Sequence, residues 1–311
     1  MTSSKSIQRV KIGDLWAFKI RSGDATAVIL EQGSQLLSYG FEGEEPVIWE
    51  SPHAKFERGT AVRGGVPVCW PWFGDMAWNS ERIQSMCTSA DSPPFHGLVR
   101  DRDWQLDSIQ LTDSSIGVTF GFEMIPNHST LWPHHARLQL SFTVGESITL
   151  ELTTENLGKR TLAISQALHS YYAVSNAENI RFIGFSGLKY FDVLDNWKMK
   201  TQCEEPTIRQ ETTRAYIGTP NRFIIEDQAW QRRIVVSTQG SRSAILWNPW
   251  KERAALIDQF RSDSWKDMVC LETARMAEDS LLLEPGDIDK MALNISVERL
   301  NTSYQKGHRN I

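Results

Sequence analysis

The sequence lacks several motifs that define large enzyme classes. Its four cysteines, Cys69, Cys87, Cys203 and Cys270, show no CxxC spacing and no paired pattern. This scatter argues against a disulfide framework and against a zinc site, so we expect reduced thiols. There is no P-loop, no dinucleotide-binding glycine pattern and no serine nucleophile elbow. A nucleotide cofactor and serine-hydrolase chemistry are therefore not expected.

Long apolar runs and excess positive charge are also missing. No apolar segment is long enough to cross a bilayer, and the opening stretch "MTSSKSIQRVKIGDLW" has no apolar core of signal-peptide length. We therefore expect a cytoplasmic protein. The formal net charge of −5 and the pI near 5.9 argue against nucleic acid and anionic membrane surfaces as partners. A local basic pocket for a small anion is compatible with this balance.

Alternation of apolar and polar residues dominates the chain and predicts β-strands. The clearest cases are residues 116–124, 137–144, 147–155 and 161–169. Turn residues separate the middle segments, and residues 25–41 predict two strands around a glycine turn. The same alternation continues towards the C-terminus in "RRIVVSTQG", "SAILWNP", "DMVCLET" and "KMALNISVERL".

Helical signals are few and short. Pro249 is followed by apolar residues at helical spacing, which predicts one short helix there. No linker, repeat or change in composition divides residues 1–311. We therefore predict one domain, an all-β fold built as a large antiparallel sandwich with few short helices.

His169 ends the predicted strand 161–169 on its face of small residues, Thr161, Ala163, Ser165 and Ala167. Small side chains leave room above a sheet, so a histidine at the rim suits a ligand site. The alternative is a histidine that caps the strand and bonds to the next loop.

Glu272 lies in the otherwise apolar stretch "MVCLETA". Alternation places Val269 and Leu271 on one face of this strand, and Cys270 and Glu272 on the other. A buried carboxylate must be paired or deliberately desolvated, and burial would raise its pKa towards the range of a general base. The alternative is an edge strand with Glu272 in water.

Two loops carry arginines. Arg63 precedes two glycines in "AVRGGVPVCWPWFG", where the planar guanidinium could bind phosphate or carboxylate oxygens or form a surface ion pair. His96 and Arg100 lie four residues apart in "PFHGLVRDRDW". This loop is either polar and solvated or an anion-binding loop with a histidine directed at a ligand. The twelve tryptophans are typical of core packing and only a hint of carbohydrate binding.

Five segments in order resemble the aldose 1-epimerase superfamily, in particular its hexose-6-phosphate 1-epimerase branch. They are "RGGVPVCWPWFG", "HGLVRDRDW", "ALHSYYAVSN", "LWNPW" and "MVCLETA", and they run from about residue 60 to about residue 275. The resemblance implies a β-supersandwich fold and a metal-free site that needs no cofactor. It also implies a small sugar phosphate as the binding partner, and we expect a monomer.

Residue by residue, the resemblance implies that His169 is the general acid and Glu272 the general base. It places His96 against the sugar, and Arg63 and Arg100 against the sugar phosphate. The implied reaction interconverts α and β anomers by ring opening and reclosure. It predicts a protonated His169 paired with an ionised Glu272, on opposite sides of the pyranose.

Three further positions matter to the resemblance. Asp192 matches a family aspartate, which we include among the substrate-binding residues without assigning its role. Thr213 stands where a sugar-contacting aspartate is expected, and a hydroxyl does not replace a carboxylate. Phe95 stands where the family often has a polar residue. These departures leave two alternatives, an epimerase for neutral aldoses and a non-catalytic carbohydrate-binding protein on the same fold.

Overall fold

Antiparallel β-sheets make up most of the regular structure in this computed structural model, which describes residues 4–88 and 93–300. The first sheet is a meander of four consecutive strands: β1 (Lys5–Ile12), β2 (Leu15–Ser22), β3 (Ala25–Leu30) and β4 (Leu36–Phe41). The two strands predicted within residues 25–41 are confirmed as β3 and β4.

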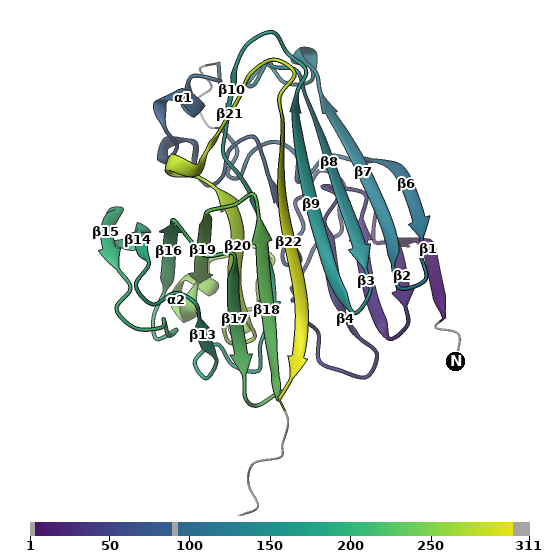
Figure 1. The fold of residues 1–311 in the computed structure, drawn as a ribbon, viewed down its shortest axis with the longest axis vertical. Coiled ribbons are helices and arrows are strands. Elements are labelled where there is room, and N and C mark those ends of the chain that lie inside the picture. Colours follow the sequence, from purple (N-terminus) through teal and green to yellow (C-terminus); the bar gives the residue numbers. More distant parts are fainter. Residues whose placement is uncertain (1–3, 89–92, 301–311) are drawn as a thin grey trace, which may run out of the picture.

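Two sheets of eight strands form the body of the molecule (Figure 1). The outer sheet has the order β13 (Arg181–Ile183), β17 (Arg222–Asp227), β18 (Arg232–Gln239), β22 (Ile288–Arg299), β9 (Ser147–Asn156), β8 (Ala136–Val144), β7 (Ile116–Met124), β6 (Gln105–Leu111). The second, which we call the site sheet, has the order β15 (Lys198–Thr201), β14 (Lys189–Asp192), β16 (Thr212–Ile217), β19 (Ser243–Asn248), β20 (Met268–Arg275), β11 (Gln166–Leu168), β5 (Val68–Cys69), with β12 (Tyr171–Ala173) also paired to β20.

The smaller elements are short. Strands β10 (Leu162–Ile164) and β21 (Leu281–Leu283) pair as a separate ribbon. Among the described residues the α-helices are α1 (Glu81–Gln84) and α2 (Trp250–Ala254), and no helix there is long and apolar enough to span a bilayer. The helix predicted after Pro249 is therefore confirmed as the single turn α2. Together these elements confirm the all-β sandwich with few short helices.

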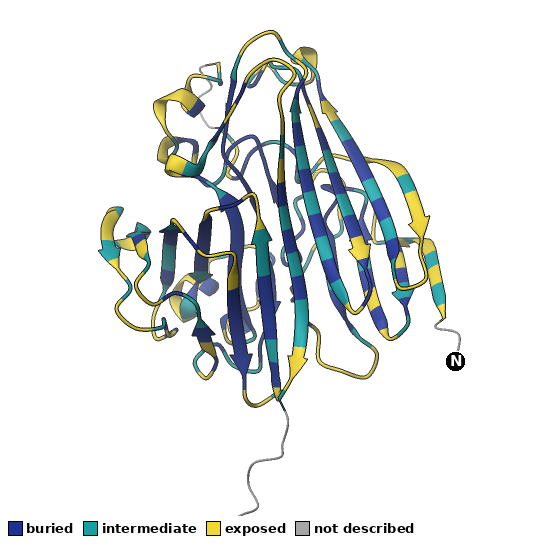
Figure 2. Ribbon diagram, in the orientation of Figure 1, coloured by how far each residue is buried: buried dark blue, intermediate teal, exposed yellow. Residues whose placement is uncertain are grey.

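The core lies between the layers. The outer sheet passes in front of the β1–β4 meander in Figure 1, and the rings of Phe18 on β2 and Phe120 on β7 meet edge to face at 5.7 Å. Figure 2 shows buried and partly exposed residues alternating along β9 and β22, whereas β19 and β20 are buried throughout most of their length. Alternation is thus typical of strands with one face exposed to solvent, whereas β19 and β20 are covered on both faces.

The single strand predicted for residues 161–169 is wrong. The chain forms β10 and β11 on either side of Ser165 and passes there from one sheet to another. The Ser165 N–H donates to the carbonyl of Pro71, and its Oγ accepts from the N–H of Phe73 at 2.9 Å. Residues 162–168 are all buried, Ser165 included, so no exposed turn residue marks the break in the sequence.

Candidate active site

One face of the site sheet forms the floor of a cavity of about 850 Å³. Cross-strand pairing places Phe191, Ala215, Ile245 and Glu272 in one row across β14, β16, β19 and β20. A parallel row two residues along each strand contains Thr213, Trp247, Cys270 and Tyr171. Because side chains two residues apart share a face of a strand, both rows point to the same side of the sheet.

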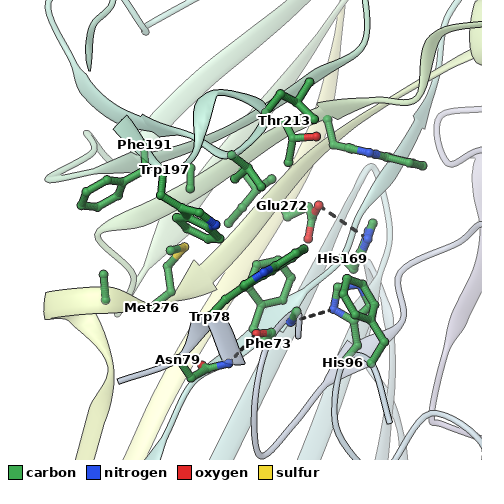
Figure 3. A pocket seen from close by; sticks show the side chains of 18 of the residues that line it. Phe73, Trp78, Asn79, His96, His169, Phe191, Trp197, Thr213, Glu272 and Met276 are labelled. Carbon is green, nitrogen blue, oxygen red and sulfur yellow. Dashed lines mark hydrogen bonds and ion pairs between the residues drawn. The ribbon is translucent and has the colours of Figure 1, made fainter. Parts of the chain in front are cut away.

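His169 and Glu272 face each other on this floor (Figure 3). His169 directly follows β11, and its Nε2 lies 3.6 Å from Oε1 of Glu272 on the adjacent strand β20. Glu272 is 2% exposed on a strand with neighbours on both sides, which excludes the alternative of an edge strand in water. Nδ1 of His169 and Oε2 of Glu272 are buried, and neither has a hydrogen-bond partner among the described residues. Each atom therefore keeps a hydrogen-bonding capacity that the described part of the chain does not use.

Burial determines the charge of this pair. It raises the pKa of Glu272 well above its ordinary 4.5. Burial, together with the nearby cations Arg100 and Arg63, lowers the pKa of His169 from 6.5 to about 3. Both shifts oppose charge on the pair, and they favour a proton on the carboxyl group over one on the imidazole. The protonated His169 beside an ionised Glu272, which the resemblance implies for catalysis, stays a prediction.

Tyr171 and Arg63 fix the position of the His169 ring. The Tyr171 ring stacks on the imidazole of His169, with ring centroids 4.8 Å apart and an interplanar angle of 9°. The Trp49 ring in turn stacks on the Tyr171 ring, with centroids 5.7 Å apart. Arg63 Nη1 donates to the Tyr171 hydroxyl at 3.3 Å. Within residues 4–88 and 93–300 the buried Nε of Arg63 has no partner, and the residue lines the cavity, so the alternative of a surface ion pair does not apply.

The backbone around His96 fixes the tautomer of its ring. The Gly74 N–H donates to Nδ1 of His96 at 3.1 Å, so the neutral ring carries its proton on Nε2. Burial lowers the pKa of His96 well below 6.5, with His169 and the arginines adding to the effect. The ring centroids of His96 and His169 lie 5.1 Å apart. His96 therefore offers an N–H donor beside the acid–base pair.

Gly97 allows the loop that contains His96 to approach the backbone of Trp70, the residue that follows β5. Its φ is +80°, and an added Cβ would lie 2.0 Å from the Trp70 carbonyl oxygen. We expect Gly97→Ala to lower the free energy of unfolding by about 3 kcal/mol or more, as measured by urea denaturation. Gly59→Ala is the matched control, because Gly59 has φ +73° with open space around it. Its cost should be about 1 kcal/mol, and an equal loss in both variants would contradict steric exclusion at Gly97.

The remaining predicted residues divide into those inside and those outside the cavity. Arg100 lines it, with Nη2 donating to the Phe95 carbonyl at 2.5 Å, and Thr213 lies on the floor. Phe95 lies at the mouth and is 46% exposed. Asp192 does not line this cavity, because its side chain alternates with Phe191 and binds Lys200 at 2.8 Å.

A metal site was not predicted, but three potential ligands lie close together. The ligand atoms of His169, Cys270 and Glu272 are all within 4.8 Å of one another. Zinc bonds of about 2.0–2.3 Å require tighter spacing, and the ion requires a thiolate. The Cys270 thiol is packed in an apolar cluster with Trp265 and Met268, and burial raises its pKa well above 9.0. This donor set fits zinc poorly.

Sequence reasoning missed several cavity residues. Tyr171 lies two residues after His169, so strand alternation could have placed it on the face of His169. Trp247 lies opposite Cys270, in the same row as Tyr171. Phe73 also lines the cavity, whereas Trp70 and Trp72 of the same loop are 0% exposed and pack in the core. The walls also include Trp78, Asn79, Trp197 and Met276, for which the sequence carries no such signal.

Comparison with known proteins points to one family. The family model described as "Aldose 1-epimerase" matches residues 17–296. A protein of Escherichia coli K12 named "Putative glucose-6-phosphate 1-epimerase" is 30% identical over 276 residues, covering 88% of each chain. A protein of the same name from Cenchrus ciliaris is 28% identical, covering 90% of this chain and 83% of its own. The crystal structure of the "putative mutarotase (YeaD)" from Salmonella typhimurium superposes with a TM-score of 0.84 at 27% identity, covering 94% of each chain.

Proposed function

This chain belongs to the aldose 1-epimerase family, and from that membership we propose that it is an isomerase that interconverts the α and β anomers of a hexose 6-phosphate. The observation that carries the proposal is the buried pair Glu272 and His169, which lies 3.6 Å apart on the cavity floor beside two arginines. Relatives named as glucose-6-phosphate 1-epimerases supply the substrate class.

In this mechanism Glu272 takes the proton of the anomeric hydroxyl while His169 protonates the ring oxygen. The C1–O5 bond breaks to give the open aldehyde, and rotation about the C1–C2 bond turns the aldehyde over. The two groups then reverse their roles as O5 attacks the other face of the aldehyde. The two oxygens share one carbon, so the acid and the base must lie close together. A separation of 3.6 Å meets that need, in contrast to the expected placement on opposite sides of the ring.

A pair that shares one proton suits this cycle. A neutral His169 with a protonated Glu272 and an imidazolium with a carboxylate contain the same number of protons. Ring opening converts the second state into the first, and reclosure reverses it. The enzyme therefore completes a turnover without exchanging a proton with solvent, which suits a buried site.

The substrate orientation follows from the arginines. In a pyranose, C6 is attached to C5, which neighbours the ring oxygen. If His169 serves the ring oxygen, C6 and its phosphate extend past His169, towards the side where Arg63 and Arg100 lie. Guanidinium groups bind phosphate through paired, charge-assisted hydrogen bonds, and the unpartnered Nε of Arg63 leaves one such donor free. His96 donates from Nε2 to a sugar oxygen.

Two-dimensional exchange NMR on the anomers of glucose 6-phosphate tests the activity, with glucose and galactose in parallel and the uncatalysed rate subtracted. We expect added exchange for the phosphosugar. Binding of the sugar phosphate without added exchange would favour the non-catalytic carbohydrate-binding protein, and Thr213→Asp would then be the first variant to examine.

Arg100→Ala tests the phosphate site. Loss of a charge-assisted hydrogen bond should lower kcat/KM for glucose 6-phosphate, relative to that for glucose, by roughly 10- to 100-fold. Arg102→Ala is the control, because Arg102 is exposed and faces Asp101, and it should leave the ratio unchanged. An equal fall for both sugars in Arg100→Ala would make Arg100 structural and favour the epimerase for neutral aldoses.

We also propose that the chain acts as one domain and as a monomer. One buried cluster draws residues from Phe18 to Ile295, which supports a single domain. Light scattering during turnover should give the mass of one chain, 35.4 kDa.

A further inference from the structure

The cavity extends well beyond the acid–base pair. The row Glu272, Ile245, Ala215, Phe191 crosses three strand spacings of about 4.8 Å, so its far end lies roughly 14 Å from the catalytic strand. From C1 to O4 a hexose crosses four bonds of about 1.5 Å, which limits its reach to less than about 6 Å. A single hexose bound at Glu272 therefore leaves the Ala215 and Phe191 end of the floor uncovered.

Aromatic side chains enclose this far end. The indoles of Trp78 and Trp197 meet at 5.5 Å, Trp78 also meets Phe95 at 5.5 Å, and Trp197 lies 6.3 Å from Phe191. Figure 3 shows Phe191, Trp197 and Met276 grouped on the side of the cavity away from His169 and His96, with Trp78 between the two groups. Trp78 is 47% exposed although it lines a cavity, so its indole surface is available to a ligand.

The backbone holds part of this wall in an unfavourable conformation. Asn196 and Trp197 have φ values of +51° and +58°, and Ala277, which also lines the cavity, has +51°. Asparagine tolerates the left-handed region, but tryptophan rarely adopts it. Such strain persists where the surrounding structure imposes it, and it is common at ligand sites. The turn after β14 is thus built to present Trp197 to the cavity.

The side chains around the aromatic end of the cavity favour one class of ligand over others. Flat aromatic rings offer apolar faces, while Asn79, Thr213 and Glu211 also line the cavity and offer hydrogen-bonding groups. This mixture suits a ring with apolar C–H faces and hydroxyls at its edge better than it suits an aliphatic chain.

We propose that the aromatic end of the cavity is a subsite for a second pyranose ring, carried on O3 or O4 of the sugar whose anomeric carbon lies at Glu272. The proposal rests on the proposed function, because the anomeric carbon sets the orientation. With O5 at His169 and C6 directed to the arginines, the C3–C4 edge is the one that turns towards Ala215 and Phe191. The enzyme should therefore prefer a reducing disaccharide with its second ring on O3 or O4 to the corresponding single hexose.

Three β-linked glucose disaccharides test this orientation by NMR exchange of their reducing ends. Laminaribiose carries the second ring on O3, cellobiose on O4 and gentiobiose on O6. At least one of the first two should exceed glucose in kcat/KM by about threefold or more. Gentiobiose should show no gain, because its second ring would occupy the arginine side. If neither laminaribiose nor cellobiose exceeds glucose, the subsite is refuted.

Trp78→Ala should bring the disaccharide-to-glucose ratio of kcat/KM close to one, and Trp78→Phe should retain part of the gain. Trp16→Ala is the matched control, since Trp16 is 37% exposed on β2 and does not line the cavity; it should leave the ratio unchanged. An equal fall for glucose and cellobiose in Trp78→Ala would overturn the proposal and assign Trp78 to the first ring.

The subsite and the catalytic activity can fail separately. If glucose 6-phosphate is exchanged but no disaccharide gains over glucose, only the subsite fails. If no sugar is exchanged, tryptophan fluorescence titration with cellobiose and glucose still tests the subsite. Tighter binding of cellobiose that is lost in Trp78→Ala would support it, and equal binding of the two sugars would reject it.

Discussion

Glu272→Gln should lower the catalysed exchange of glucose 6-phosphate anomers by about 10²–10⁴-fold, and His169→Asn should do so by a similar factor. The amide keeps the shape of the side chain but accepts no proton from the anomeric hydroxyl. The double variant should lose little more than either single variant, because an acid and a base that act in one step are not additive. Exchange NMR after subtraction of the uncatalysed rate measures all three.

The chain offers a matched control for both substitutions. His135 and Glu123 form a second histidine–glutamate pair, with Nε2 2.7 Å from Oε1, on the exposed surface outside the main cavity. Glu123→Gln and His135→Asn should leave exchange unchanged. Activity above about one-tenth of wild type in Glu272→Gln would contradict the assignment of Glu272 as the base.

The same substitution should raise stability, increasingly so as the pH rises. The pKa of Glu272 is higher in the folded chain than its ordinary 4.5, so above pH 4.5 the folded state holds a proton that the unfolded state has released. Each such pH unit costs the wild type about 1.4 kcal/mol until the pH reaches the folded pKa. Glutamine does not titrate and avoids this loss.

His169 contributes with the opposite sign. Its folded pKa is lowered to about 3 from 6.5, so its contribution is lost as the pH falls through that interval. The two groups therefore give opposite dependences of stability on pH. The part due to Glu272 dominates above about pH 6.5, where His169 is neutral in both the folded and the unfolded state.

Urea denaturation of wild type and Glu272→Gln from pH 4 to pH 9 measures the effect. The two proteins should converge near pH 4 and diverge as the pH rises, with the variant the more stable. Glu123→Gln is the control, because Glu123 is 50% exposed on the surface outside the cavity. A constant difference for Glu272→Gln across the range would show that Glu272 is already ionised in the folded protein.

The sequence predicted those parts of the molecule that depend on local patterns. Alternation in "MVCLETA" placed Glu272 opposite Leu271, and the structure puts Leu271 in the core between the sheets and Glu272 in the cavity. The strand at residues 116–124 has the bounds that alternation gave it. The break at Ser165 was missed because both halves of that segment are buried and keep the same period.

The missed site features depend on distant parts of the chain. The stacking of Tyr171 on His169 and the lowered pKa of the imidazole depend on burial and on the nearby Arg100 and Arg63, which alternation does not reveal. Trp78 and Trp197 come from loops with no periodic pattern, and they meet only because separate loops converge over the sheet. The family aspartate at Asp192 faces Lys200 outside the cavity.

The contact between His169 and Glu272 has a kinetic consequence. The two residues are far apart in the chain and become neighbours through the pairing of β11 and β12 with β20. Closing such a long loop is slow relative to local hairpin formation. Recovery of anomer exchange after dilution from denaturant would therefore report the moment at which these two strands join, later than any signal from the β1–β4 meander.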